Sequence, residues 1–147
     1  MQLLSDDFSN QERIPERFTC DGEDVSPSLR WEQLPEGTAR LALTCEDPDA
    51  PRGTFVHWVM WNIDPSPGGL SIGEDPADAR PGRNDFGNNF YRGPCPPPGH
   101  GTHHYHFTAY AVSEPIDLEA GASIDDLRSA MAGKVLDEAT LIGTYER

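Results

Sequence analysis

Residues 103–112 read HHYHFTAYAV, a run rich in aromatic and small side chains with no glycine or proline. Such a run is typical of a buried β-strand. Residues 55–63, FVHWVMWNI, have the same character, and residues 39–46, ARLALTCE, form a third apolar segment. Loops rich in proline and glycine separate the three segments. The pattern therefore predicts three long strands of one sheet, with loops between them that could carry function.

The composition favours a mainly β protein. The 147-residue chain contains 14 glycines and 14 prolines, and only 36% of its residues are hydrophobic. This density of turn residues favours short strands over long helices. No repeat or linker divides the chain, so we predict one domain over residues 1–147, folded as a β-sandwich with one C-terminal helix.

The predicted helix runs from Ser123 to about Ala139. Ser123 can cap its first turn, and the acidic residues that follow favour the positive end of the helix. Its apolar side chains recur on one face, at Ile124, Leu127, Met131 and Val135. The final residues, 139–147, are predicted to return to a strand.

The chain is strongly acidic. It carries 25 acidic and 11 basic residues, for a net charge of −14, and Lys134 is its only lysine. Phosphates of nucleic acids and anionic membrane surfaces would repel it, so neither is predicted as a bulk partner. Two hypotheses fit the acidic excess: adaptation to a host that accumulates salt, or an ordinary acidic protein that prefers arginine.

The cysteines and the chain start point to a reducing compartment. Cys20, Cys45 and Cys95 have no CxxC spacing and cannot all pair, which predicts free thiols and no cysteine-based zinc site. The start, MQLLSDDFSNQERIP, lacks a basic segment followed by an apolar run, and no stretch of about 18 apolar residues occurs. We therefore predict no signal peptide, no membrane span and a cytoplasmic location.

Strand alternation brings candidate ligand-binding side chains together. His103 and Tyr105 lie on one face of their strand, whereas His104 and His106 lie on the other. The preceding residues 93–101, GPCPPPGHG, combine rigid prolines with permissive glycines, as the rim of a pocket requires.

At this point two long motifs resemble a known family. Residues 47–63, DPDAPRGTFVHWVMWNI, and 82–105, GRNDFGNNFYRGPCPPPGHGTHHY, resemble the two signatures of the phosphatidylethanolamine-binding (PEBP) family. The flanks CDGEDVSPSLRW and VLDEATLIGTYER resemble its prokaryotic YbhB/YbcL branch, the Raf kinase inhibitor-like proteins. The resemblance implies a two-sheet Greek-key β-sandwich with long functional loops. It also implies a pocket for acetate, phosphate or a phospholipid head group.

The resemblance implies the members of this pocket as well. Asp47 would orient a pocket histidine, and the ligand-binding set would be Asp47, Asp49, His57, Gly93, Pro94, His103 and Tyr105. Two positions depart from the family pattern: His104 replaces the usual arginine, and Phe90 replaces a glycine. The preferred ligand is therefore left open, and prokaryotic relatives suggest a possible homodimer.

Other functions remain as alternatives. The four histidines at positions 100–106 could suggest a metal site, but alternation separates them, so we predict neither a metal nor a cofactor. Cys95 lies between prolines with no identified base, and no serine lies in a recognisable elbow. We therefore predict a binding protein and not an enzyme. A phosphoester hydrolase and a regulator of a kinase or protease remain alternatives, the regulator using the same pocket.

Salt dependence separates the two hypotheses on charge. If the acidic excess is an adaptation to salt, the free energy of unfolding should rise from low salt to molar salt, because salt screens the repulsion between surface carboxylates. Urea unfolding at both salt concentrations measures this. Unchanged stability would favour the ordinary acidic protein.

Overall fold

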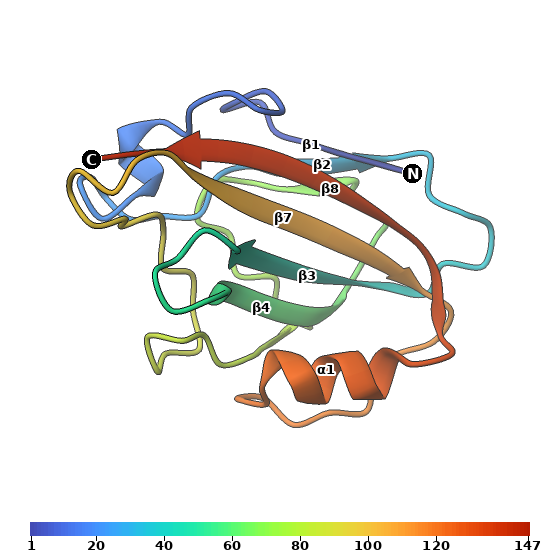
Figure 1. Cartoon of the computed structure of the whole chain (residues 1–147). Coiled ribbons are helices and arrows are strands. Elements are labelled where there is room, and N and C mark those ends of the chain that lie inside the picture. Colours follow the sequence, from blue (N-terminus) through green and yellow to red (C-terminus); the bar gives the residue numbers. More distant parts are fainter.

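Two antiparallel sheets form a sandwich in the computed structural model, which describes residues 1–147 (Figure 1). The larger sheet contains, in spatial order, β6 (Arg80–Pro81), β4 (Phe55–Ile63), β3 (Arg40–Asp47), β7 (His103–Val112) and β8 (Val135–Tyr145). The smaller sheet contains β1 (Gln2–Leu4), β2 (Leu29–Glu32) and β5 (Gly69–Leu70). A short 3₁₀ turn, η1 (Glu16–Phe18), lies between β1 and β2. The three long strands expected from the sequence are present, whereas the strands of the smaller sheet were not located from the sequence.

The strand order is that of a Greek key. β3, β4 and β6 follow one another in the sheet, and β7 returns by a long connection to pair with β3 on its other side. This is the order 4-1-2-3 that defines the motif. The expected two-sheet Greek-key β-sandwich is thus confirmed. The return of β7 places its first residue beside the last residues of β3.

The main core lies between the two sheets. The inward residues of β7 alternate with half-buried ones along the whole strand, as its sequence predicted. They pack with aromatic and aliphatic side chains of the smaller sheet and of β3 and β4 in one cluster of 20 buried residues. Close packing of this kind holds the strands that carry the core side chains in fixed positions.

The helix α1 (Ile124–Met131) covers the other face of the large sheet beside β4 (Figure 1). The Ser123 hydroxyl accepts a hydrogen bond from the Asp126 N–H, and the Asp126 carboxylate accepts one from the Ser123 N–H, so the predicted cap is a capping box. The helix ends eight residues earlier than predicted. Gly133 follows it with φ of +79°, and the next residues pair with β7 as the start of β8. Val135 therefore belongs to β8, where it is 41% exposed.

The cysteine prediction was wrong. Cys20 and Cys95 form a disulfide across 75 residues of sequence, and only Cys45 is a free, buried thiol. Their backbones meet because the Cys20 N–H donates to the Pro94 carbonyl oxygen at 3.1 Å. This contact joins the turn after η1 to the loop before β7. Sequence spacing cannot reveal such a pair, since two distant loops must first be brought together.

No helix in the structure combines the length and apolar character needed to cross a membrane.

Reduction of the disulfide should destabilise the fold. Closing a loop of this length restricts the unfolded chain, and the expected loss on reduction is about 2–4 kcal/mol. Urea unfolding with and without dithiothreitol measures the change. The double variant Cys20→Ser/Cys95→Ser is the control, because its stability should not respond to the reductant. A wild type equally insensitive to reductant would contradict a stabilising disulfide.

Candidate functional site

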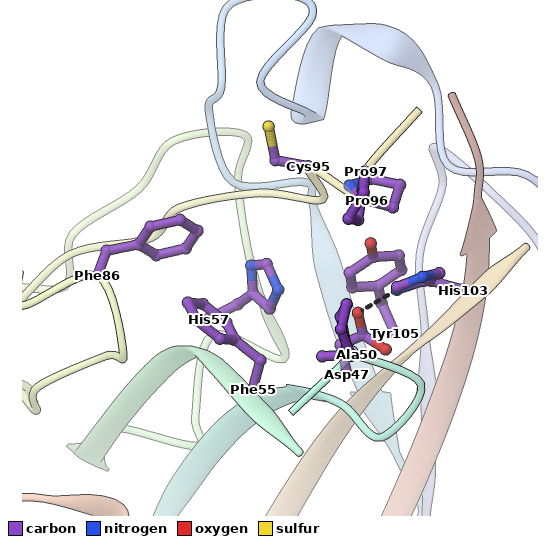
Figure 2. Close-up of a pocket in the computed structure, with 11 residues that line it drawn as sticks. Asp47, Ala50, Phe55, His57, Phe86, Cys95, Pro96, Pro97, His103 and Tyr105 are labelled. Carbon is purple, nitrogen blue, oxygen red and sulfur yellow. Dashed lines mark hydrogen bonds and ion pairs between the residues drawn. The ribbon is translucent and has the colours of Figure 1, made fainter. Parts of the chain in front are cut away.

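A pocket of about 240 Å³ opens where β3 ends and β4 and β7 begin (Figure 2). It is lined by Asp47, Ala50, Pro51, Phe55, His57, Phe86, Cys95, Pro96, Pro97, His103 and Tyr105. Most of its surface is apolar, with a few polar atoms converging on the interior. Pockets for drug-sized ligands usually exceed about 300 Å³, so this one suits a small group.

Asp47 and His103 form a buried hydrogen-bonded pair. The Asp47 Oδ2 lies 2.6 Å from the His103 Nδ1, and the two residues are 3% and 1% exposed. The other carboxylate oxygen accepts the Asp49 N–H at 2.8 Å. The carboxylate thus orients the His103 ring and keeps a proton on its Nδ1.

His57 enters the pocket because of a β-bulge. Cys45 pairs with Trp58 and Glu46 pairs with Val56, which leaves His57 as an extra residue of β4. Strict alternation would send His57 and Trp58 to opposite faces of the sheet. With the bulge, both face inward: Trp58 joins the main core and His57 lines the pocket. Bulges commonly redirect a side chain in this way beside functional sites.

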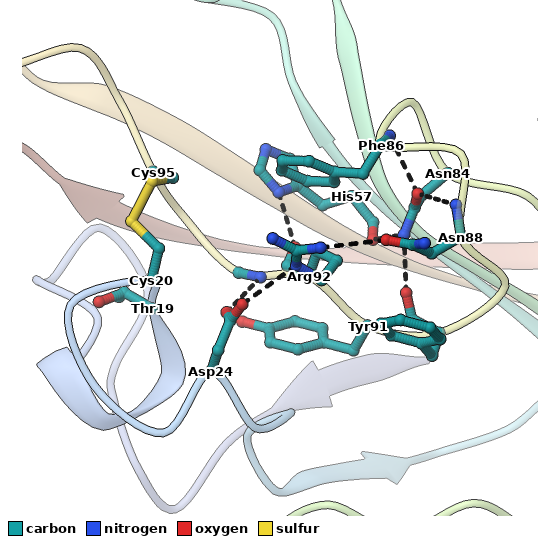
Figure 3. Close-up of polar contacts among 12 residues, drawn as sticks. Thr19, Cys20, Asp24, His57, Asn84, Phe86, Asn88, Tyr91, Arg92 and Cys95 are labelled. Carbon is teal, nitrogen blue, oxygen red and sulfur yellow. Dashed lines mark hydrogen bonds and ion pairs between the residues drawn. A yellow bond between two sulfur atoms is a disulfide. The ribbon is translucent and has the colours of Figure 1, made fainter.

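The orientation of His57 is set from behind by the backbone. Its Nδ1 lies 2.7 Å from the Arg92 carbonyl oxygen, which can only accept, so Nδ1 carries a proton and donates (Figure 3). Nε2 is left as the ring nitrogen available to a ligand. Burial lowers the pKa of His57 below its ordinary value, only partly offset by the hydrogen bond to Arg92. Burial in this pocket therefore favours neutral His57.

Asp24 holds the Arg92 peptide in place. One Asp24 oxygen accepts the Gly93 N–H at 2.7 Å, and the other lies 3.3 Å from the Arg92 Nε (Figure 3). A single carboxylate thus anchors both residues around the carbonyl group that contacts His57. Asp24 lies within the CDGEDVSPSLRW segment, and the sequence alone did not indicate that it has a role in the site.

Tyr105 contributes a neutral donor. Its ring is fully buried and stands edge-on to that of His57, with 5.3 Å between ring centroids. Burial, with a further contribution from the Asp47 charge, raises the pKa of Tyr105 far above its ordinary value. The hydroxyl therefore stays protonated and can donate to an acceptor in the pocket.

Phe86 forms a wall that the sequence did not identify as part of the site. Its ring lies 4.8 Å from that of Phe55 and 5.4 Å from that of His57, and the Arg92 guanidinium covers it at 4.7 Å. The turn that presents it depends on Asn84, whose Oδ1 accepts the N–H groups of Phe86 and Asn88. The NDFG sequence, a turn motif carrying one exposed aromatic, was the available signal.

Three predicted site residues do not line the pocket. Asp49 faces away from it and accepts both the N–H and the ring Nδ1 of His104 at 2.8 Å. Gly93 and Pro94 lie behind the rim, where the Gly93 N–H is used by Asp24 and the Pro94 carbonyl by Cys20. They position the loop whose next residues, Cys95, Pro96 and Pro97, line the pocket. The other four predicted residues do meet there: Asp47, His57, His103 and Tyr105.

No group of three or more His, Cys, Asp or Glu side chains is arranged to hold a metal ion. The pocket also lacks a free thiol, because Cys95 is bonded to Cys20.

The family described as phosphatidylethanolamine-binding protein matches residues 4–146 of the chain. A UPF0098 protein of Methanothermobacter thermautotrophicus is 47% identical over 152 residues, covering 100% of this chain and 99% of the relative. This chain belongs to the PEBP family. Its fold agrees with that membership.

Two solved PEBP-family structures superpose closely on this chain. A PEBP homologue from Chlamydia trachomatis is 36% identical with a TM-score of 0.94, covering 99% of this chain and 97% of its own. YbcL from E. coli is 31% identical with a TM-score of 0.92, covering 99% and 98%. The chain is therefore a YbcL-like member of the family. An inhibitor of carboxypeptidase Y, solved with its proteinase, shares the fold alone, at 14% identity and a TM-score of 0.56 over 93% of this chain and 76% of its own.

The lowered pKa of His57 predicts a stability change with pH. The folded protein binds the His57 proton less readily than the unfolded chain, in which the ordinary value of about 6.5 applies. Stability is therefore complete above pH 6.5 and declines as the pH falls through that value towards the lower folded pKa. Compared with His57→Asn, which keeps a donor for the Arg92 carbonyl, the wild type should lose more free energy of unfolding between pH 7.5 and pH 5. Parallel pH curves would show that His57 titrates normally.

Proposed function

We propose that this PEBP-family protein binds a small anion or a phosphorylated head group, such as phosphate or phosphoethanolamine, and does not transform it. The observation that carries the proposal is the convergence of His57 and Tyr105 on a small, largely apolar pocket, beside the buried Asp47–His103 pair. Imidazole N–H groups and a phenol are suitable donors for the oxygens of an anion. Apolar walls exclude water and strengthen these hydrogen bonds.

The expected affinity for a bare anion is low. A hydrogen bond to a charged group contributes about 1.5–3 kcal/mol, and two or three of them must also offset the cost of immobilising the ligand. The net charge of −14 adds long-range repulsion at low salt. Dissociation constants near the millimolar range follow for phosphate alone. A physiological ligand would gain affinity from apolar groups that contact Phe55 and Phe86.

Several features favour binding over catalysis. The one cysteine in the pocket is in a disulfide and cannot supply a thiolate nucleophile. No side-chain cluster suits a metal that would activate water. His57 and His103 could still serve as base and acid, so a phosphoester hydrolase remains the weaker alternative. Release of phosphate from p-nitrophenyl phosphate, lost in His57→Asn, would support it.

A regulator of a protein partner is the second candidate function. Phe86 and Phe90 are 37% and 54% exposed and lie on the loop that forms one side of the pocket. Exposed aromatic residues beside a pocket are typical of protein interfaces. The inhibitor of carboxypeptidase Y shows that the fold can support such a role in another protein. A pulldown at high salt with wild type and His103→Ala tests it: a partner lost with the pocket would favour the regulator. A homodimer also stays a prediction, which light scattering would check.

The disulfide sets a condition on the predicted cytoplasmic location. Disulfides persist in oxidising compartments and in the cytosol of some hyperthermophiles, whereas most cytosols keep thiols reduced. We propose that the chain acts where the Cys20–Cys95 bond survives. Alkylation of freshly lysed cells, followed by intact mass, shows whether two of the three cysteines are protected.

Anion binding itself is tested by calorimetric titration of phosphate and phosphoethanolamine in molar salt at pH 6 and pH 8. We expect millimolar binding that weakens at pH 8, because an anion is bound best by protonated His57. Sulfate, whose charge is constant over this range, separates the titration of the protein from that of phosphate. His57→Asn should bind about tenfold more weakly, and Tyr105→Phe several-fold more weakly.

His106→Ala is the matched control for these variants, since His106 lies on the opposite face of β7 and does not line the pocket. Its affinity should equal that of the wild type. Absence of binding at either pH, or equal binding by His57→Asn, would overturn the proposal and bring the protein-partner function forward.

A further inference from the structure

A second histidine occupies the outer nitrogen of His103. The His100 Nδ1 lies 2.7 Å from the His103 Nε2, and the two rings meet at 62° with 4.9 Å between centroids. The His103 Nδ1 is already bonded to Asp47. Both nitrogens of His103 are therefore engaged within the protein, so this ring has no free donor for a ligand.

The two imidazoles share one hydrogen. A contact of 2.7 Å between ring nitrogens requires a proton on one of them and a lone pair on the other. If His103 carries the proton on Nε2, His100 is its acceptor, and if His100 carries it, His103 has no Nε2–H. In either arrangement His103 can donate to an anion only after His100 has moved away.

His100 is attached so that it can move. It is exposed, and it lies between Gly99 and Gly101, whose φ angles are +77° and +97°. The loop backbone is held by the Gly99 N–H on the Arg147 carbonyl and the His100 N–H on the Pro97 carbonyl, but a Cβ added at either glycine would meet no neighbouring atom within 4 Å, so there is space around the His100 ring. Displacement of the ring would cost one hydrogen bond and would leave the core unchanged.

We propose that His100 occupies the position an anion oxygen takes at the His103 Nε2, and that ligand binding displaces it. This inference rests on the proposed anion-binding function and deepens it. His100 is then a specificity-determining residue, since only a ligand that replaces its hydrogen bond gains access to His103. The step requires two protons on the pair besides the His103 Nδ1 proton held by Asp47: one shared between the His103 Nε2 and the His100 Nδ1, and one on the His100 Nε2. His100 then leaves as a neutral imidazole that keeps its Nε2 proton, and the shared proton stays on the His103 Nε2 and is donated to the anion.

Removing a histidine from an anion site usually weakens anion binding, but the proposal predicts that removing His100 strengthens it. Removing the imidazole in His100→Ala should tighten phosphate binding about two- to tenfold, the range that corresponds to the net value of one hydrogen bond. His100→Asn should restore affinity towards that of the wild type, because the amide oxygen can accept near the position of the lost Nδ1. His106→Ala should match the wild type.

Calorimetric titration of phosphate and sulfate into the full-length chain and these three variants, at one pH and salt concentration, tests the idea. Tighter binding by His100→Ala together with near wild-type binding by His100→Asn supports it. Binding by His100→Ala that is equal to or weaker than that of the wild type overturns it, even though the anion-binding function would stand. Absence of binding by every protein, including His100→Ala, overturns the anion-binding function and the inference with it.

A measurement without ligand gives a second criterion. Nitrogen NMR of the histidine rings should show His103 with a protonated Nδ1 in all variants, and an Nε2 signal that shifts in His100→Ala but not in His106→Ala. Addition of phosphate to the wild type should then move the His100 ring signals towards those of a solvent-exposed imidazole. Ring signals of His100 that stay unchanged at saturating phosphate would contradict displacement.

Discussion

The hydrogen bond between Asp47 and His103 is the constraint around which the pocket is organised. It joins the last residue of β3 to the first residue of β7, two strands that become neighbours only through the Greek-key return. Burying a carboxylate carries a large desolvation cost, which this short bond and the Asp49 N–H offset. Apolar residues of similar volume would often be at least as stable. The effect of the pair on the site is to fix the His103 ring and its Nδ1 proton.

The two pocket histidines are held by different hydrogen-bond partners. His57 donates to the backbone carbonyl of Arg92, and burial lowers its pKa, so it lines the pocket as a neutral ring. His103 is instead hydrogen-bonded to the carboxylate of Asp47. A ligand that brings negative charge would favour protonation of His57, which links binding to proton uptake. Tyr105, kept protonated by burial, adds a donor that does not change with pH.

The loops around the pocket are fixed by contacts that lie behind it or at its rim. Asp24 anchors the peptide whose carbonyl orients His57, Asn84 shapes the turn that presents Phe86, and the Cys20–Cys95 disulfide ties the proline-rich rim to the start of the chain. Of these anchoring residues, only Cys95 lines the pocket. A small pocket therefore depends on polar contacts spread over distant parts of the sequence, as preorganised sites generally do. The backbone at the tip of the His100 loop is also held, by the Gly99 N–H on the Arg147 carbonyl and the His100 N–H on the Pro97 carbonyl, whereas the His100 side chain is exposed.

The sequence by itself determined the long strands, the start of the helix and the grouping of His103 with Tyr105, because strand alternation and capping are local rules. Its family motifs gave the fold and placed Asp47 and His57 beside them. Tertiary structure alone decided that a bulge turns His57 inward, that Cys20 reaches Cys95 and that Asp49 faces away with His104. It also decided that residues after Gly133 extend β8 instead of α1. The physical reason is common to these cases: each depends on pairing between segments far apart in the chain, where hydrogen bonds and packing between strands outweigh local preference.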